Sequence, residues 1–382
     1  MLSTTEAKSK CAPIEVKADF TADFHKNSEQ KTLEYPMIFE EGKFVRCLLT
    51  HGIWPLDFDI HLPTCENLEF LEINSNSSLA YLLEYKPFGT ALKQLKISKC
   101  PGLVLHLHLM ELTSLESLEF NSCFFLSCSI QDYFPLTLKK LKIVNCPNSE
   151  LVLKVLMEQK GLSIESLLIE GCSSLFSFPM DKLPATIRHL KIENCVNLTS
   201  FSESLKIEKD HSVIFGVEDD SNLQNLALFS TLNLRELEIW DCPNLKLLPE
   251  GLFNLKNLEL LSLSNCFSLV CFPEEGLPST SLKSLLIFSC YCLKSLPNYL
   301  DEFRSLHTLS LFVCPRLVSF PGGCLPPDLE TIYVADCERL IQVCKWRLHG
   351  LKHLKRKIII WGCPRTKNFV YEDEDNFDIA IH

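Results

Sequence analysis

Apolar and polar residues alternate in one short frame that recurs along most of the chain. The frame reads Leu-x-x-Leu-x-Ile-x-x-Cys, and Leu282–Cys290 is a clear copy of it. The alternation around Leu285 and Ile287 predicts a short strand with its apolar side chains on one face. An earlier copy at Leu68–Ile73 lacks the cysteine, and a blurred copy ends at Cys363.

The copies recur at a nearly fixed period. Most steps between their cysteines are 23 to 26 residues long, but Cys195 and Cys242 are 47 apart, which predicts one decayed copy between them. Such a period is typical of a leucine-rich-repeat solenoid, in which each strand buries its apolar face only by stacking on its neighbours. We therefore predict an α/β fold, a leucine-rich-repeat solenoid shaped as a curved horseshoe. A parallel β-sheet forms its concave face, and loops, turns and short helices form its convex face.

The repeated cysteines are expected to be structural. A small, weakly polar side chain suits the point where the chain turns off the strand, and its S–H is a weak donor toward the turn backbone. The residues concerned are Cys100, Cys123, Cys146, Cys172, Cys195, Cys242, Cys266, Cys290, Cys314, Cys337 and Cys363.

The repeat pattern divides the chain into three parts. Residues 1–62 form an N-terminal non-repeat region, polar and then apolar, which would cap the open end of the stack. Residues 63–366 form a leucine-rich-repeat domain of about 12 repeats, irregular at 200–232, where a loop or a degenerate repeat is expected. Residues 367–382 form an acidic tail. Helical spacing on the convex side predicts helices at Ser149–Gln159 and Glu338–His349.

Composition narrows the class of protein. A net charge of −11 over 382 residues argues against a general binder of nucleic acid, which would need a basic stripe. No apolar run is long enough to insert into a membrane, and the first residues lack an apolar signal core. The 19 cysteines are odd in number and mostly sit at one repeat position, so we expect reduced thiols in a cytoplasmic protein.

Motifs for catalysis and cofactor binding are missing from the sequence. There is no GxxxxGK[ST] phosphate loop and no GxGxxG opening a helix. The pairs Cys290–Cys292 and Cys123–Cys128 lack the CxxC spacing of zinc sites, and His106 and His108, two residues apart in a repeat crossing, are expected to be polar surface. We expect no catalytic, cofactor-binding or metal-binding residues, and a protein that binds other proteins without being an enzyme.

Residues facing outward from the predicted strands suggest where a partner protein would bind. Lys96, Glu119 and Lys142 form a ladder of alternating charge in neighbouring copies. Toward the C-terminus the same face becomes apolar and aromatic, and its large side chains are expected to be exposed together, which marks a protein-binding site. They are Trp240, Leu286, Phe288, Phe312, Tyr333 and Trp361. At Trp361 a covering C-terminal helix or tail is an equally good explanation.

The spelling of the repeats resembles that of a known family. Leu234–Pro249, Leu282–Pro297 and the interspersed Gly276-Leu-Pro are similar to repeats of plant nucleotide-binding leucine-rich-repeat disease-resistance proteins, especially the coiled-coil type. The resemblance covers about residues 63–366. It implies a recognition module of plant innate immunity that senses a pathogen effector or a guarded host protein, or regulates a nucleotide-binding signalling module. The nucleotide-binding module and coiled coil have no counterpart here, so only the C-terminal domain of such receptors is resembled.

Two alternatives to an immune sensor remain open. A repeat-only adaptor, such as the substrate receptor of a ubiquitin ligase, would also use this fold, although residues 1–62 hold no convincing F-box. A receptor fragment without its own function is the other, and the irregular stretch at 200–232 would fit it.

Overall fold

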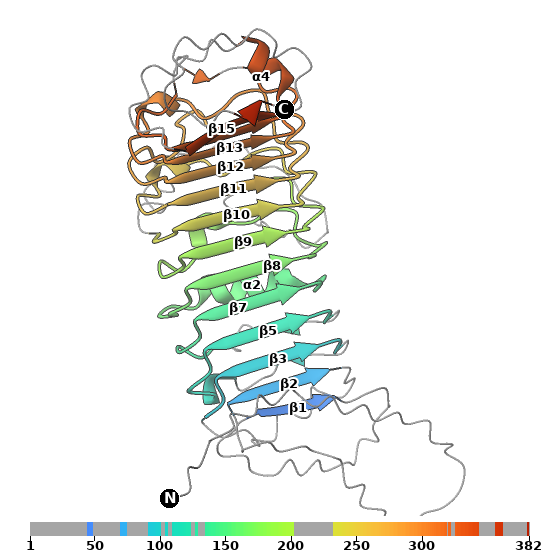
Figure 1. Cartoon of the computed structure of the whole chain (residues 1–382). Helices are drawn as coiled ribbons and strands as arrows, with labels where there is room; N and C mark the ends of the chain where they lie inside the picture. The colour runs from blue at the N-terminus through green and yellow to red at the C-terminus, as the bar shows by residue number, and fades with distance from the viewer. Residues whose placement is uncertain are drawn as a thin grey trace, which may run out of the picture.

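The computed structural model describes residues 44–48, 69–74, 91–100, 104–105, 109–123, 127–128, 134–201, 232–318, 320–321, 325–343, 356–361 and 380–381. Within these ranges, 14 strands form one sheet in which every neighbouring pair is parallel. Figure 1 shows the strands stacked like rungs from the N-terminal to the C-terminal end. The leucine-rich repeats thus build a solenoid, as predicted.

The strands of the main sheet are, in spatial order, β1 (Phe44–Leu48), β2 (Phe70–Asn74), β3 (Gln94–Ser98), β5 (Ser117–Asn121), β7 (Lys140–Val144), β8 (Ser166–Glu170), β9 (His189–Glu193), β10 (Glu236–Trp240), β11 (Leu260–Ser264), β12 (Ser284–Phe288), β13 (Thr308–Phe312), β14 (Thr331–Ala335), β15 (Arg356–Trp361) and β16 (Ala380–Ile381). A second, two-stranded sheet pairs β4 (Val104–Leu105) with β6 (Ser127–Cys128). The helices are η1 (Leu109–Glu111), α2 (Ser149–Glu158), η2 (Met180–Lys182), η3 (Leu252–Asn254), η4 (Leu300–Glu302) and α4 (Glu338–Val343).

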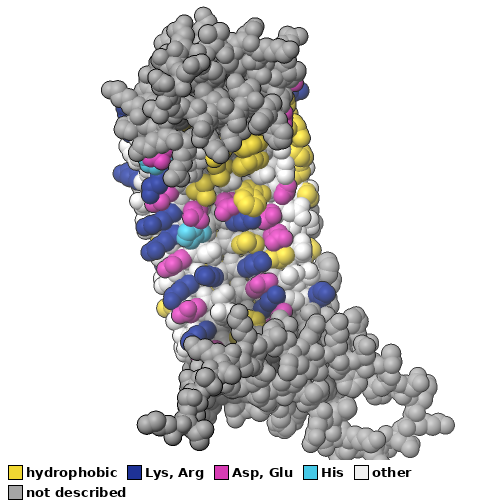
Figure 2. Space-filling view, viewed as in Figure 1, with side chains coloured by type: hydrophobic (Ala, Val, Ile, Leu, Met, Phe, Trp, Pro, Cys, Tyr) yellow, Lys and Arg dark blue, Asp and Glu magenta, His cyan; other side chains and the backbone are white. Residues whose placement is uncertain are grey.

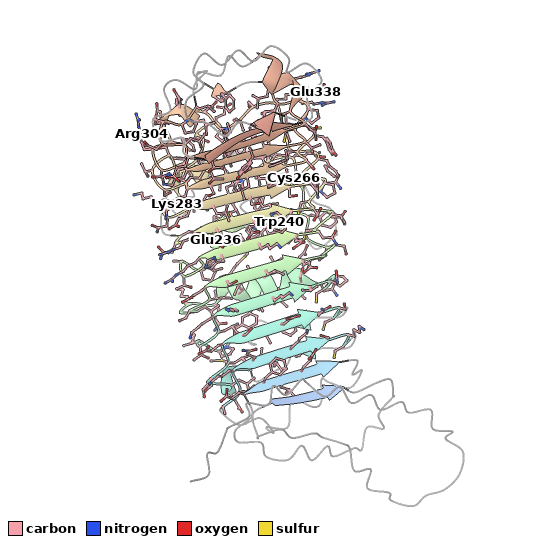
Figure 3. All side chains as sticks on the ribbon, in the orientation of Figure 1. Glu236, Trp240, Cys266, Lys283, Arg304 and Glu338 are labelled. Carbon is pink, nitrogen blue, oxygen red and sulfur yellow. The ribbon has the colours of Figure 1, made fainter. Side chains whose placement is uncertain are left out.

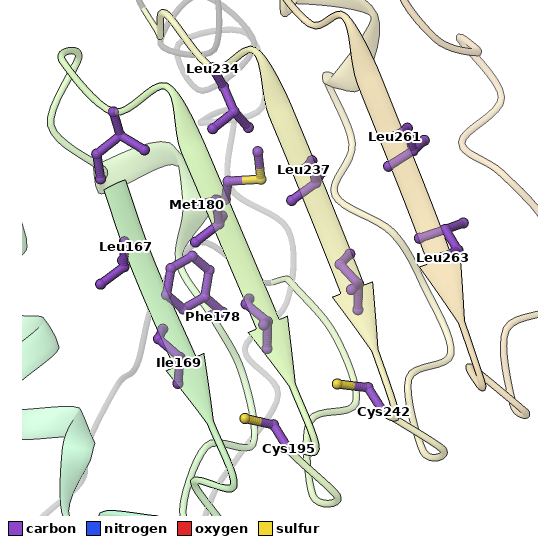
Figure 4. Packing of buried hydrophobic residues seen from close by; sticks show 14 of the residues in the cluster. Leu167, Ile169, Phe178, Met180, Cys195, Leu234, Leu237, Cys242, Leu261 and Leu263 are labelled. Carbon is purple, nitrogen blue, oxygen red and sulfur yellow. The ribbon is translucent and has the colours of Figure 1, made fainter. Parts of the chain in front are cut away.

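The core follows from the alternation within each strand. The second and fourth residues of a strand point inward, so Leu167 and Ile169 of β8 are at most 1% exposed. Figure 4 shows the same pair of positions repeated on neighbouring strands, as Leu237 on β10 and Leu261 and Leu263 on β11. Each such side chain contributes about 1.5–3 kcal/mol by leaving water, and the rows merge into one continuous core.

A residue with positive φ leads from each strand into its cysteine. These residues have φ between 50° and 64° and include Lys99, Ser122, Asn145, Gly171, Asn194, Asp241, Asn265, Ser289, Val313 and Asp336. This left-handed conformation turns the chain while keeping its N–H in the ladder: Asn265, for example, donates to the Phe288 carbonyl at 3.0 Å. Asn, Asp and Gly tolerate it, whereas the branched Val313 is strained there.

Each described repeat cysteine directly follows one of these turn residues, and its side chain points into the core. The ten from Cys100 to Cys337 are fully buried free thiols. Each Sγ donates to the carbonyl two residues earlier, at 3.2–3.6 Å. Cys266 also reaches the Ile239 carbonyl of the preceding copy at 3.6 Å. Cys363 lies outside the described residues.

The crossings behind the sheet are mostly turns with single helical turns between them. The predicted helix at Ser149–Gln159 is confirmed as α2, which buries Val152, Leu153, Val155 and Leu156. The helix predicted from Glu338 is present as α4 up to Val343, and residues 344–349 lie outside the described part.

The strands on either side of the long step between Cys195 and Cys242 are neighbours in the sheet. β9 pairs directly with β10, with Lys191 opposite Glu238, so the expected decayed copy does not stand between them. Residues 202–231, which hold that stretch, lie outside the described residues.

Short strands extend the sheet at both ends. Phe44–Leu48 of the expected N-terminal cap forms β1 and pairs with β2. Ala380–Ile381, at the end of the expected acidic tail, pairs with β15 as β16. The remainder of 1–62 and 367–382 lies outside the described residues, so the proposed boundaries of these parts stay predictions.

Candidate functional site

On the main-sheet strands from β3 to β14, the first, third and fifth residues point away from the core and make up what we call the open face of the sheet. It corresponds to the concave face of the sequence analysis. Because neighbouring strands pair without offset from β2 to β14, equivalent positions form straight columns across the open face. Figure 2 shows alternating charges over its N-terminal part and hydrophobic side chains gathered toward the C-terminal part.

The predicted charge ladder occupies the third-residue column at the N-terminal end. Lys96 Nζ lies 3.7 Å from Glu119, and Lys142 Nζ lies 4.0 Å from the same carboxylate. Sequence reasoning left out Glu72, which extends the ladder to β2 at 3.5 Å from Lys96. Glu72 is buried. The other three side chains are partly exposed, so each ion pair among them is worth about 0–1 kcal/mol. The ladder balances its own charge.

A second charged column, missed by the sequence analysis, lies just before the strands begin. Lys139 and Glu116 are 3.1 Å apart, and Lys283 and Glu259 are 2.8 Å apart. The Lys283 ammonium holds the pKa of the Glu259 carboxyl below its ordinary value. The signal in the sequence is the alternating sign of the residue that precedes each strand, which runs from Glu69 before β2 to Arg188 before β9.

Trp240 on β10 is held by its neighbours. Lys191 Nζ lies 3.7 Å from the centre of the indole ring, and Trp240 Nε1 donates to Ser262 Oγ at 3.0 Å. Lys191 also contacts the Glu193 carboxylate at 2.7 Å. Figure 3 marks Trp240 and Glu236 on this strand. The ring therefore covers Ser262, which is only 2% exposed.

Phe288 and Phe312 form the centre of the apolar part. Their strands pair in register, and the rings stack with centroids 5.1 Å apart and planes 13° from parallel. Stacking lets two large side chains share the narrow spacing between adjacent strands.

In the third-residue column, large side chains on adjacent strands are avoided by a different arrangement. Large and small residues alternate there, since Leu286 and Tyr333 flank Ser310 on the intervening strand. Ser310 is 5% exposed although it points outward. The larger neighbours thus close over the serine and form a continuous surface.

The predicted partner-binding residues are only partly brought together as expected. Leu286, Phe288, Phe312 and Tyr333 lie on three consecutive strands, and Trp240 lies two strands before Phe288. All five side chains are half-buried and so less exposed than expected: the Phe288 and Phe312 rings stack on each other, and Lys191 lies over Trp240. Their role in binding a partner stays a prediction. The backbone of Trp361 pairs with Ala335 on β14, and its side chain lies outside the described residues.

Neither a cluster of metal-binding side chains nor a membrane-spanning helix occurs in the described part of the chain. It contains no group of three or more His, Cys, Asp or Glu side chains placed to hold a metal ion. None of the helices among the described residues is long and apolar enough to span a bilayer.

Comparison with known proteins gives distant structural likeness. No protein-family model and no curated protein sequence matches the chain. The leucine-rich-repeat domain of the type III effector XopL is 18% identical over 61% of this chain, which spans 64% of that domain, with a TM-score of 0.34. A leucine-rich-repeat protein of Leptospira interrogans is 15% identical, covering 83% of this chain and 86% of its own, with a TM-score of 0.35.

A third solved structure is a receptor. The plant peptide hormone receptor RGFR1, in complex with RGF2, is 13% identical, covering 83% of this chain and 60% of its own, with a TM-score of 0.21. At these identities and scores, the likeness of the three structures says nothing about what this chain binds.

Proposed function

We propose that the chain is a protein-recognition module of plant innate immunity. Its partner is a pathogen effector, a guarded host protein or a nucleotide-binding signalling module. The cytoplasm is its proposed location, in keeping with the twelve cysteines whose side chains are described, all of which are free thiols.

One observation carries the protein-binding part of the proposal. On β11–β14 the first, third and fifth residues include no charged side chain, and the stacked Phe288 and Phe312 lie at the centre of this area. The core of a protein interface is usually poor in charged residues and rich in aromatic ones, and its rim is polar. The open face has both kinds of surface side by side. The immune role is supported by the sequence pattern of repeats such as Leu234–Pro249, which resembles that of plant nucleotide-binding leucine-rich-repeat receptors.

Proximity labelling in plant cells tests the proposal. The full chain would be compared with Phe288→Ala/Phe312→Ala and with Phe176→Ala, a matched control whose ring is 57% exposed away from the open face. We expect a pathogen protein or an immune-receptor nucleotide-binding module to be labelled by the full chain and the control, and lost with the double variant. Purified pairs would then be tested for direct binding.

Other outcomes would contradict parts of this proposal. Ubiquitin-ligase subunits in place of immune components would favour a substrate adaptor. Recovery of chaperones alone would indicate a receptor fragment without its own partner. Immune components retained by the double variant would place the binding surface elsewhere.

A further inference from the structure

The open face changes its charge in three zones along the stack. On β2–β7 the charges of the third-residue column alternate in sign, and each charged residue forms its ion pairs with adjacent residues of the same column. On β8–β10, which we call the acidic zone, carboxylates predominate. On β11–β14, the neutral zone, the outward strand positions carry no charge.

The acidic zone holds more carboxylates than its own cations can neutralise. Glu170, Glu193, Glu236 and Glu238 point outward there, against the single ammonium of Lys191 and the imidazole of His189. Lys191 contacts Glu193 at 2.7 Å, and His189 Nδ1 lies 2.8 Å from Glu236.

Two carboxylates of this zone remain for a partner. Within the described part of the chain, Glu170 and Glu238 form no ion pair closer than 4.0 Å, and Lys142 on the adjacent strand reaches toward Glu119. Burial raises the pKa of the Glu238 carboxyl, an effect opposed by the nearby Lys191. A cation from a partner would relieve this unfavourable environment.

The neutral zone begins immediately beside these carboxylates. β11 presents Leu260 and Ser264, since the Trp240 ring covers Ser262, and the Phe288–Phe312 stack follows on β12 and β13. Strand β11 carries no charge and thus lies between the carboxylates of β8–β10 and the stacked phenylalanines. A partner that crosses it meets negative charge first and an apolar surface next.

Building on the proposed function, we propose that the open face binds an extended segment of the partner protein that carries a Lys or Arg and, farther along, a large apolar side chain. The segment runs across the strands. Its Lys or Arg lies over the acidic zone, where the charges of Glu170 and Glu238 attract it, and its apolar side chain packs on Phe288 and Phe312.

The strand spacing sets the separation of the two side chains. From Glu238 on β10 to Phe312 on β13 there are three strand intervals, or roughly 14 Å at about 4.8 Å each. An extended chain advances about 3.3 Å per residue, so the basic and apolar residues should be about four or five positions apart.

A displayed library of random 12-residue peptides tests this inference directly. Peptides selected on the purified full chain would be counter-selected on Phe288→Ala/Phe312→Ala, then synthesised and measured by fluorescence polarisation. The informative variant is Glu170→Gln/Glu238→Gln. Its matched control is Glu250→Gln, an exposed carboxylate in a turn away from the open face, and Phe176→Ala again controls the aromatic pair. Circular dichroism would verify that each variant is folded.

We expect the selected peptides to be enriched in Lys or Arg four or five positions from an aromatic or large aliphatic residue. Glu170→Gln/Glu238→Gln should weaken their binding about tenfold or more, with the two controls unchanged. Added salt should weaken binding to the native chain more than to this variant.

Two results would overturn the inference. Peptides that need Phe288 and Phe312 but show no basic enrichment and bind Glu170→Gln/Glu238→Gln normally would refute the charge assignment, while leaving the proposed function intact. If no peptide depends on the two phenylalanines, the extended-segment mode is wrong. The proximity-labelling experiment then decides separately whether this face binds folded proteins.

Discussion

Phe288 and Phe312 stack in register on adjacent strands, with ring centroids 5.1 Å apart. Both rings stand on the open face, outside the core formed by the second and fourth strand positions. The pair can therefore supply a flat apolar surface without being needed to bury the leucines beneath it.

A double-mutant cycle on this pair should separate stacking from folding. We expect Phe288→Ala and Phe312→Ala to leave the sheet intact and to show a coupling energy of about 0.5–1.5 kcal/mol in the free energy of unfolding. Urea denaturation followed by circular dichroism measures it. The distant combination of Phe176→Ala with Phe312→Ala should be additive within about 0.5 kcal/mol. A coupling near zero for the stacked pair would contradict the contact.

Replacing Val313 should stabilise the protein. Its φ of 54° is costly for a branched side chain, whereas the equivalent Asn265 has nearly the same φ, 53°, and adds a hydrogen bond to Asp241 Oδ1 at 2.6 Å. We expect Val313→Asn to raise the free energy of unfolding by about 1 kcal/mol. The reverse change, Asn265→Val, should lower it by at least as much. If only the second effect appears in urea titrations, strain at Val313 is not significant.

The repeat thiols should be chemically silent in the folded protein. Burial raises the pKa of the Cys242 thiol to about 11, so only about one in a thousand is a thiolate at pH 8. A hydrogen bond with Cys195 lowers the pKa of the Cys172 thiol to about 7, so there it is complete burial that keeps reagents away. Among the described cysteines, Cys271 is exposed and Cys292 partly exposed. We expect iodoacetamide to modify these two first, as read by peptide mass spectrometry, and the ten buried thiols only after unfolding in guanidinium. Early modification of the buried set would show that the stack opens readily.

Shortening the irregular step should preserve the sheet, because β9 and β10 already pair directly. Deleting the 24 residues Glu203–Leu226 from the 47-residue step leaves 23, the length of an ordinary repeat. We expect the variant to keep its strand signal in circular dichroism and its unfolding midpoint within a few degrees. Removing the five residues of β11 instead should disrupt the stack. Loss of folding in the first variant would mean that the deleted segment supports the core.

The sequence alone was sufficient to predict the repeating part of the fold. The alternation of Leu285 and Ile287 with outward residues depends only on the two-residue period of a strand, and the spacing of Cys266 and Cys290 sets which strands are neighbours. Because these patterns are local and repeated, they were enough to predict the strand positions, the buried cysteines and the Lys96–Glu119–Lys142 ladder.

Only the tertiary structure decided which outward side chains contact one another and how far each is buried. It brought β9 against β10 across the 47-residue step, which placed Lys191 over Trp240 and left Glu238 in the acidic zone. It also buried Ser262 and Ser310, although both point outward. The reason is physical: a strand's own pattern determines which way a side chain points, but its exposure and its partners depend on the size and conformation of side chains from strands distant in sequence.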